Sequence, residues 1–152
     1  MVDTTMIRFA QKKDVKRLIE LCELHAQYEN SSYSSAGKEH ALIKHLFTET
    51  PSLYCLVALV NQEIIGYATY MKQFSTWDAN FYLYLDCLFL TNESRGFGIG
   101  QKLIEFIKED AIKLGCNQIQ WQTPDFNKRA MKFYDRIGGV SKSKERYFLK
   151  IQ

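Results

Sequence analysis

Residues 83–100, LYLDCLFLTNESRGFGIG, decide the fold of this chain. LYLDCLFL is an apolar run of strand length with one acid, TNES is a polar break and RGFGIG is a glycine-rich turn. Beyond this turn, apolar residues recur at helical spacing, at Leu103, Ile107, Ala111 and Leu114. Glycines before a helix leave its first N–H groups accessible, and those groups bind phosphate with help from the helix dipole. The sequence therefore predicts an anion site, with a pyrophosphate as the favoured ligand.

Two common phosphate-binding loops do not match this turn. A dinucleotide fingerprint, G-x-G-x-x-G, requires glycine where Gln101 stands, and a P-loop requires a Gly-Lys-Ser/Thr tripeptide that does not occur in the chain. The pattern that does match is Arg-x-x-Gly-x-Gly, formed by Arg95, Gly98 and Gly100. This pattern resembles the acetyl-coenzyme A loop of the GCN5-related N-acetyltransferases.

A second pattern strengthens this resemblance. Residues 127–138, Asn-x-x-Ala-x-x-Phe-Tyr-x-x-x-Gly, resemble the second signature of the same family, on a helix that follows the next strand. Asp125 is expected to cap this helix, and Gly138 stands where a glycine commonly ends one. The resemblance runs from about residue 7 to residue 148. It is nearest to diamine and polyamine acetyltransferases, with a short match at residues 76–78 to fungal histone-acetyltransferase-like members.

The resemblance implies where acetyl-CoA binds. The glycine loop would hold the pyrophosphate, and the strand segment Leu88–Leu90 would pair with the pantetheine arm and supply a backbone N–H for the oxyanion. Asn127 would reach the cofactor with its side-chain amide, although a purely structural role at the start of its helix explains it equally well. The implied cofactor-binding residues are Leu88, Phe89, Leu90, Arg95, Gly96, Phe97, Gly98, Ile99, Gly100, Gln101, Asn127, Ala130 and Phe133.

Tyr134 is the predicted general acid. Acetylation of an amine requires removal of a proton from the amine and protonation or stabilisation of the leaving thiolate. The resemblance places the tyrosine of the Phe-Tyr pair at the cofactor sulfur, and a phenol is ordinarily protonated at pH 7. The alternative is a core aromatic residue on an amphipathic helix. The expected effect of Tyr134→Phe is unchanged acetyl-CoA affinity with kcat lowered about 100-fold.

Asp86 is the predicted general base because it is the one charge in an otherwise apolar strand. We expect its carboxylate to be buried, where a charge is costly unless it is paired or functional. In the polyamine branch a Glu stands at this distance before the loop arginine. Asp is one methylene shorter, so a water relay is expected, and a structural hydrogen bond to a loop is the alternative. Alternation along the strand predicts that Cys87 points to the opposite face.

The amine acceptor is predicted to bind between acidic and aromatic side chains. The candidates are Tyr28 and Glu29 near the end of the first long helix, and Trp77 and Asp78 in a loop between strands. The expected acceptor is a primary amine: a polyamine or diamine first, then a lysine-like compound, an aminoglycoside or a protein lysine. Direct transfer in a ternary complex is expected. The alternatives are transfer of a longer acyl group and a non-catalytic CoA-binding regulatory module.

The whole chain, residues 1–152, is predicted to form one N-acetyltransferase domain. The fold class is α/β, a mixed and mostly antiparallel central sheet flanked by helices, as the family resemblance implies. Helices are expected at Asp14–Tyr28, at Lys38–Phe47, after the glycine loop and over the second signature. Strands are expected at Met6–Phe9, Leu53–Val60, Ile64–Met71, residues 83–90, Gln118–Gln122 and Arg146–Ile151.

Composition sets further limits. The net charge of +3 is too small to argue for nucleic acid, although residues 101–152, near the predicted phosphate site, carry the excess of base. No apolar run is long enough to span a membrane, and the four cysteines form no C-x-x-C pair, so a reduced, cytoplasmic protein is the simplest interpretation. The three histidines show no metal-binding spacing, and we expect no metal. The resemblance also implies a possible homodimer.

Overall fold

The structure is a computed structural model that describes residues 4–152. It forms two compact units, one ending at Gln122 and one beginning at Thr123, and each is described by itself. The elements of the first unit are β1 (Thr5–Phe9), α1 (Val15–Tyr28), α2 (Lys38–Leu46), β2 (Tyr54–Val60), β3 (Glu63–Ser75), β4 (Asn80–Leu90), α3 (Ile99–Lys113) and β5 (Ile119–Trp121). The second unit contains α4 (Lys128–Arg136).

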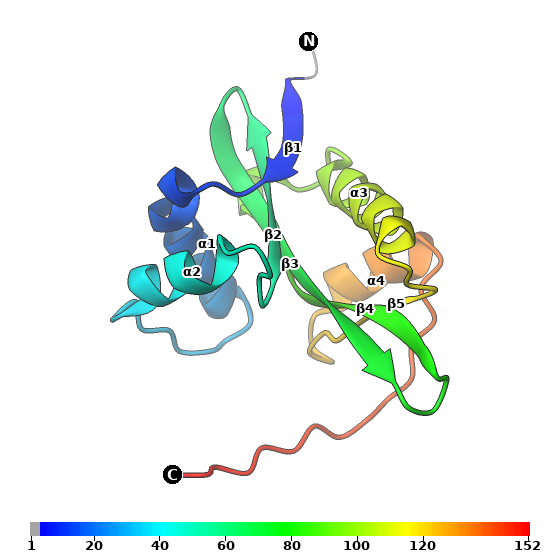
Figure 1. The fold of residues 1–152 in the computed structure, drawn as a ribbon. Helices are drawn as coiled ribbons and strands as arrows, with labels where there is room; N and C mark the ends of the chain where they lie inside the picture. The colour runs from blue at the N-terminus through cyan, green and yellow to red at the C-terminus, as the bar shows by residue number, and fades with distance from the viewer. Residues whose placement is uncertain (1–3) are drawn as a thin grey trace. The chain divides into compact units, whose positions relative to one another are not determined.

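The first unit is built on a five-stranded sheet in the order β1-β2-β3-β4-β5. The pairs β1–β2, β2–β3 and β3–β4 are antiparallel, and only β4–β5 is parallel. Helices α1 and α2 lie on one face of this sheet and α3 on the other (Figure 1). The predicted mixed, mostly antiparallel sheet flanked by helices is therefore confirmed.

Side chains alternate along each strand, so the strands contribute apolar residues to both faces of the sheet. Leu18 and Leu21 of α1 pack with Val57 and Tyr67 in the core under α1 and α2. On the opposite face, Leu103 and Ile107 of α3 are completely buried. The two central strands β2 and β3 are buried along most of their length because helices cover both of their faces.

A β-bulge interrupts the β3–β4 ladder at Asp86. Thr69 pairs with Cys87 and Tyr70 pairs with Leu85, so Asp86 is the extra residue without a partner in β3. A bulge breaks the alternation of side chains and redirects those beside it. Asp86 and Cys87 therefore both lie on the face covered by α1, with the Cys87 sulfur 3.7 Å from Asp86 Oδ2. The prediction that Cys87 points to the face opposite Asp86 is wrong for this reason.

Strand β4 is paired on both edges over only part of its length. On the β5 side, Leu83–Leu85 pair with Ile119–Trp121. Among the described residues, no strand pairs with the rest of β4 on that side, from Asp86 to Leu90. Because β4 continues beyond the end of β5, backbone groups along this edge are left without a strand partner.

The predicted last strand, Arg146–Ile151, is absent. Residues 139–152 form neither helix nor strand, and Tyr147 and Leu149 are about nine-tenths exposed. An alternating apolar pattern becomes a strand only where its backbone groups pair with another strand, and no strand of the described chain pairs with this segment. The remaining predicted elements are all present, with β3 and β4 longer than expected at the hairpin that joins them.

Candidate active site

The glycine loop has the backbone of an anion site. Gly96 and Gly98 have φ values of +87° and +80°, in the left-handed region that favours glycine. A Cβ atom added at either position would meet no atom within 4 Å, so the space beside the loop is open. Gly98 is the N-cap of α3, with no side-chain cap and no acid in the first turn of the helix. The residues present therefore fit a pyrophosphate at the positive end of the helix dipole.

Arg95 connects this loop to the end of α1. Its Nε donates a 3.0 Å hydrogen bond to the Leu90 carbonyl, and its guanidinium lies 4.2 Å from the centre of the Tyr28 ring and 5.4 Å from that of Phe89. Such cation–π stacking fixes a guanidinium in one orientation. The structure thus brings together Arg95 and Tyr28, which the sequence assigned separately to the cofactor and to the acceptor.

Asp86 is exposed, which corrects the prediction of a buried carboxylate. The bulge turns it out of the core, and Thr69 Oγ1 donates to its Oδ2 at 3.4 Å. Cys87, beside it, is largely buried, and burial followed by the charge of Asp86 raises the pKa of the Cys87 thiol to about 12. This thiol stays protonated at neutral pH, which argues against a cysteine nucleophile at this site.

Glu29, a predicted acceptor residue, belongs to a hydrogen-bonded group whose other two members, His25 and Tyr67, were not predicted as part of the site. His25 Nδ1 lies 2.7 Å from the Tyr67 hydroxyl, and His25 Nε2 lies 2.7 Å from Glu29 Oε2. The sequence signal was the spacing of His25 and Glu29, four residues apart on one helix, which places them on the same face. Tyr67 could not be found in this way because it lies 42 residues away on β3.

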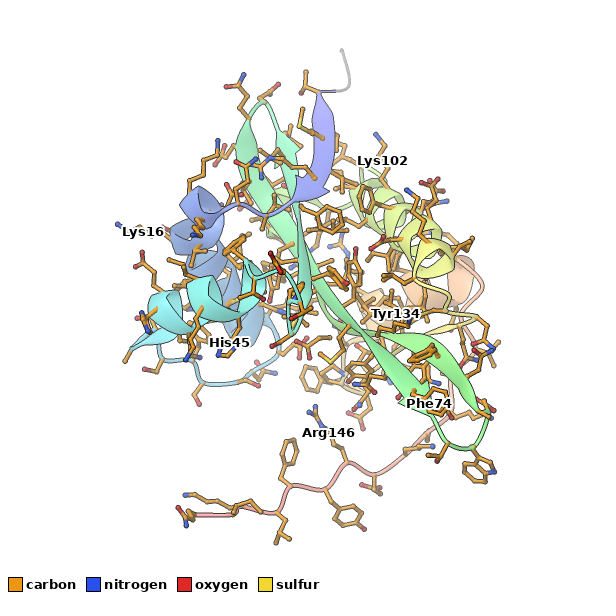
Figure 2. All side chains as sticks on the ribbon, viewed as in Figure 1. Lys16, His45, Phe74, Lys102, Tyr134 and Arg146 are labelled. Carbon is orange, nitrogen blue, oxygen red and sulfur yellow. The ribbon has the colours of Figure 1, made fainter. Side chains whose placement is uncertain are left out.

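The second predicted acceptor segment lies at the β3–β4 turn. Trp77 is 95% exposed, and the Asp78 backbone N–H donates to Ser75 Oγ. Phe74, near this turn (Figure 2), packs edge-on against Phe81 with ring centres 5.0 Å apart. Trp77 and Asp78 belong to the β3–β4 turn, whereas Tyr28 and Glu29 lie at the C-terminal end of α1, so the acceptor candidates come from two separate elements.

The second unit carries the second signature on α4. Asn127 is the N-cap, with its Oδ1 accepting from the Ala130 N–H at 3.3 Å, so the prediction that Asp125 caps this helix is wrong. Asn127, rather than Asp125, immediately precedes the first residue of the helix, and the N-cap occupies that position. Gly138, with φ of +97°, ends the helix as predicted. Tyr134 projects from α4 (Figure 2), partly buried, with its ring 5.5 Å from that of Phe133.

Two further properties concern the described residues as a whole. No three His, Cys, Asp or Glu side chains in residues 4–152 gather closely enough to hold a metal ion. None of the helices in that range is long and apolar enough to cross a membrane.

Comparison with known proteins identifies the class of this chain. Residues 6–139 match the model of the acetyltransferase (GNAT) family. The chain is 36% identical over 141 residues to the thialysine N-epsilon-acetyltransferase of Bos taurus, covering 88% of this chain and 82% of that protein. The chain therefore belongs to the acetyltransferase (GNAT) family, and it is an acetyl-CoA-dependent N-acetyltransferase.

Two other similar proteins extend this comparison. The chain is 26% identical over 151 residues to the human spermidine/spermine N(1)-acetyltransferase-like protein 1, covering 95% of this chain and 22% of that protein. Its fold matches an aminoglycoside N-acetyltransferase solved in complex with CoA, with a TM-score of 0.82 at 15% identity, covering 100% of this chain and 98% of that one. The first agrees with the predicted resemblance to polyamine acetyltransferases, and the second with the predicted fold.

Proposed function

We propose that this enzyme acetylates a cationic primary amine, with a polyamine or diamine as the first choice. The observation that carries this proposal is the position of two carboxylates on the α1 face of the sheet. Asp86 is exposed in the bulge of β4, and Glu29 lies at the C-terminal end of α1. The C-terminal end of a helix is itself partly negative and favours cations. A molecule with two ammonium groups is attracted by both.

The relatives support the same choice of acceptor. One is named for thialysine and another for spermidine and spermine, all of which carry an amine on a flexible chain. Lysine-like compounds follow in our order of preference, and then aminoglycosides and protein lysines. The proposal also includes three further points: residues 1–152 form one N-acetyltransferase domain, the enzyme is a homodimer, and it acts in the cytoplasm.

The chain's own groups supply the proton transfers in this proposal. Asp86 accepts the proton of the ammonium group, through a water molecule, so that the neutral amine can attack. A backbone N–H near Leu88 donates to the oxygen that becomes negative during the attack. Tyr134 donates the proton that the departing sulfur requires. Acetyl-CoA, when bound, supplies the activated thioester carbonyl.

Binding of acetyl-CoA is assigned to the loop and to the edge of β4. The left-handed glycines and the first turn of α3 hold the pyrophosphate, and Arg95 adds a positive charge beside them. The edge of β4 that β5 leaves unpaired, Leu88–Leu90, pairs with the amide groups of the pantetheine arm. Asn127, Ala130 and Phe133 of the second signature complete the proposed cofactor contacts. The side chains of Asn127, Ala130 and Phe133 take no part in the chemical step.

The test is CoA thiol release with a panel of amines for four proteins. We expect Asp86→Asn to lower kcat/KM at least 10-fold and to remove the acid limb of its pH profile, and Tyr134→Phe to lower kcat about 100-fold. Glu63→Gln, at the exposed first residue of β3, is the matched control and should behave as the wild type. Acetyl-CoA affinity should be unchanged in all three variants. Equal kcat/KM and pH profiles for wild type and Asp86→Asn would remove Asp86 from the mechanism.

A further inference from the structure

Glu29, His25 and Tyr67 form a continuous hydrogen-bonded chain from the protein surface to the core. The side chain of Glu29 is 31% exposed and that of His25 15%, whereas Tyr67 is 2% exposed. Both links of the chain, Glu29 Oε2 to His25 Nε2 and His25 Nδ1 to the Tyr67 hydroxyl, measure 2.7 Å. The chain therefore connects a partly exposed carboxylate to a fixed point on the central sheet.

The two ends of this hydrogen-bonded chain differ in chemistry. An ionised carboxylate only accepts hydrogen bonds, so Nε2 of His25 donates to Glu29. At the other end, burial raises the pKa of the Tyr67 hydroxyl, with further contributions from the neighbouring thiols of Cys87 and Cys22. The hydroxyl therefore stays protonated and shares a 2.7 Å hydrogen bond with Nδ1 of His25. Both ring nitrogens of His25 are therefore engaged, one by Glu29 and one by Tyr67.

Ring contacts also hold the imidazole in place. Its ring lies 5.0 Å from that of Phe89 at an interplanar angle of 21°, and it meets Tyr67 edge-on at 5.8 Å. Phe89 in turn lies beneath the Arg95 guanidinium, 5.4 Å away. The ring of His25 cannot rotate without breaking these contacts, so Glu29 receives a hydrogen bond from a donor in a fixed place.

The position of Glu29 is unfavourable for the helix alone. Glu29 is the C-cap residue of α1, where the helix dipole disfavours a negative charge. The carboxylate is nevertheless held there by His25. Helix carbonyls and a fixed carboxylate at one point make a local site for a positive charge.

We propose that His25 is a positioning residue that fixes the Glu29 carboxylate to bind the second, non-reacting ammonium group of the acceptor. This inference rests on the proposed function and deepens it, because it selects diamines over monoamines. Glu29 contacts the acceptor directly, whereas His25 acts through Glu29. The reacting amine is left to Asp86, on the same face of the sheet.

The experiment compares His25→Leu with His25→Gln, using putrescine and n-butylamine as acceptors of equal carbon number. Leu keeps the bulk but loses both hydrogen bonds, so KM for putrescine should rise about tenfold, which corresponds to roughly 1.4 kcal/mol of binding. KM for n-butylamine, kcat and acetyl-CoA affinity should change less than about twofold, well below that tenfold step. Gln can donate to Glu29 and accept from Tyr67, and should restore most of the putrescine affinity.

Controls separate positioning from folding. His45→Leu, on the exposed side of α2 (Figure 2), should leave both KM values unchanged. If His25→Leu does not fold, Tyr67→Phe removes one link of the chain while keeping the packing, and should raise KM for putrescine alone. Calorimetric binding of putrescine to the CoA-bound protein gives a readout that does not require turnover.

The two failures are distinguishable. Absence of thiol release by the wild-type enzyme with every amine would overturn the proposed function. Equal putrescine binding by the wild type and His25→Leu, or an equal rise in KM for putrescine and n-butylamine, would overturn the role of His25. Loss of putrescine affinity in His25→Leu with rescue in His25→Gln supports it.

Discussion

Gly66 fixes the distance between β3 and β4 beside the proposed cofactor site. Gly66 pairs with Leu90, and a Cβ atom added at Gly66 would overlap Leu90 Cδ2 and lie 2.8 Å from the Phe89 carbonyl oxygen, where ordinary contact begins at 3.4 Å. The Leu90 side chain can rotate away. The Phe89 carbonyl belongs to the strand backbone and has to move with it. Gly66→Ala therefore pushes the end of β4 away from β3.

The expected cost follows from overpacking of a buried site. Inserting one methyl group into a well-packed region costs about 1–3 kcal/mol, and we expect about 2 kcal/mol for Gly66→Ala because one of its two clashes involves backbone. The displaced segment includes Leu88–Leu90, so acetyl-CoA affinity should fall together with stability. The measurements are urea unfolding at 25 °C followed by tryptophan fluorescence, and calorimetric titration with acetyl-CoA.

A double-mutant cycle with Leu90→Ala tests the cause. Removing the Leu90 side chain relieves one clash, so the double variant should be more stable than the sum of the two single changes predicts, by about 1 kcal/mol. The destabilisation that remains in the double variant measures the effect of the clash with the Phe89 carbonyl. A Gly66→Ala protein within about 0.5 kcal/mol of the wild type, the usual range for harmless substitutions, and with unchanged acetyl-CoA affinity would refute this reasoning.

Two further predictions concern hydrogen bonds that join elements of the first unit. Burial raises the pKa of Asp14, but hydrogen bonds from Arg8 and from the Gln11 N–H outweigh burial and hold this pKa below its usual value. The contribution of Asp14 to stability is therefore present above about pH 4 and is lost as pH falls through the lowered pKa. Asp14→Asn should reduce stability at pH 7 by about 1–3 kcal/mol and flatten its decline below about pH 4, as measured by urea unfolding across pH; an unaltered pH dependence would contradict this. The buried Tyr70 donates a 2.6 Å hydrogen bond to Asp110 of α3, so Tyr70→Phe should cost about 1–2 kcal/mol in the same assay without changing acetyl-CoA affinity, and an equally stable variant would count against it.

Local patterns were enough to predict most elements of this fold. The helical spacing after the glycine loop gave α3, and the second signature gave α4, because each depends on residues close in sequence. The left-handed glycines were also predictable, since a turn before a helix needs them at Gly98 and a helix end at Gly138.

What the sequence did not contain was information set by pairing between distant segments. The bulge at Asp86 depends on the register of β4 against Thr69 and Tyr70, and it changed both the exposure of Asp86 and the face of Cys87. Strand pairing also decided the fate of residues 146–151, whose apolar alternation suits a strand that the described chain does not pair. The contact between His25 and Tyr67 is likewise long-range.

The edge of β4 that β5 leaves unpaired has a consequence for how substitutions are tolerated. Every residue except proline carries the same N–H and C=O groups, so a ligand held through backbone pairing is indifferent to side-chain identity. In the proposed complex, side-chain changes within Leu88–Leu90 therefore leave the backbone contacts with the acetyl donor in place. Among substitutions in Leu88–Leu90, proline alone removes the N–H itself. Acceptor preference can therefore diverge on this strand independently of donor binding.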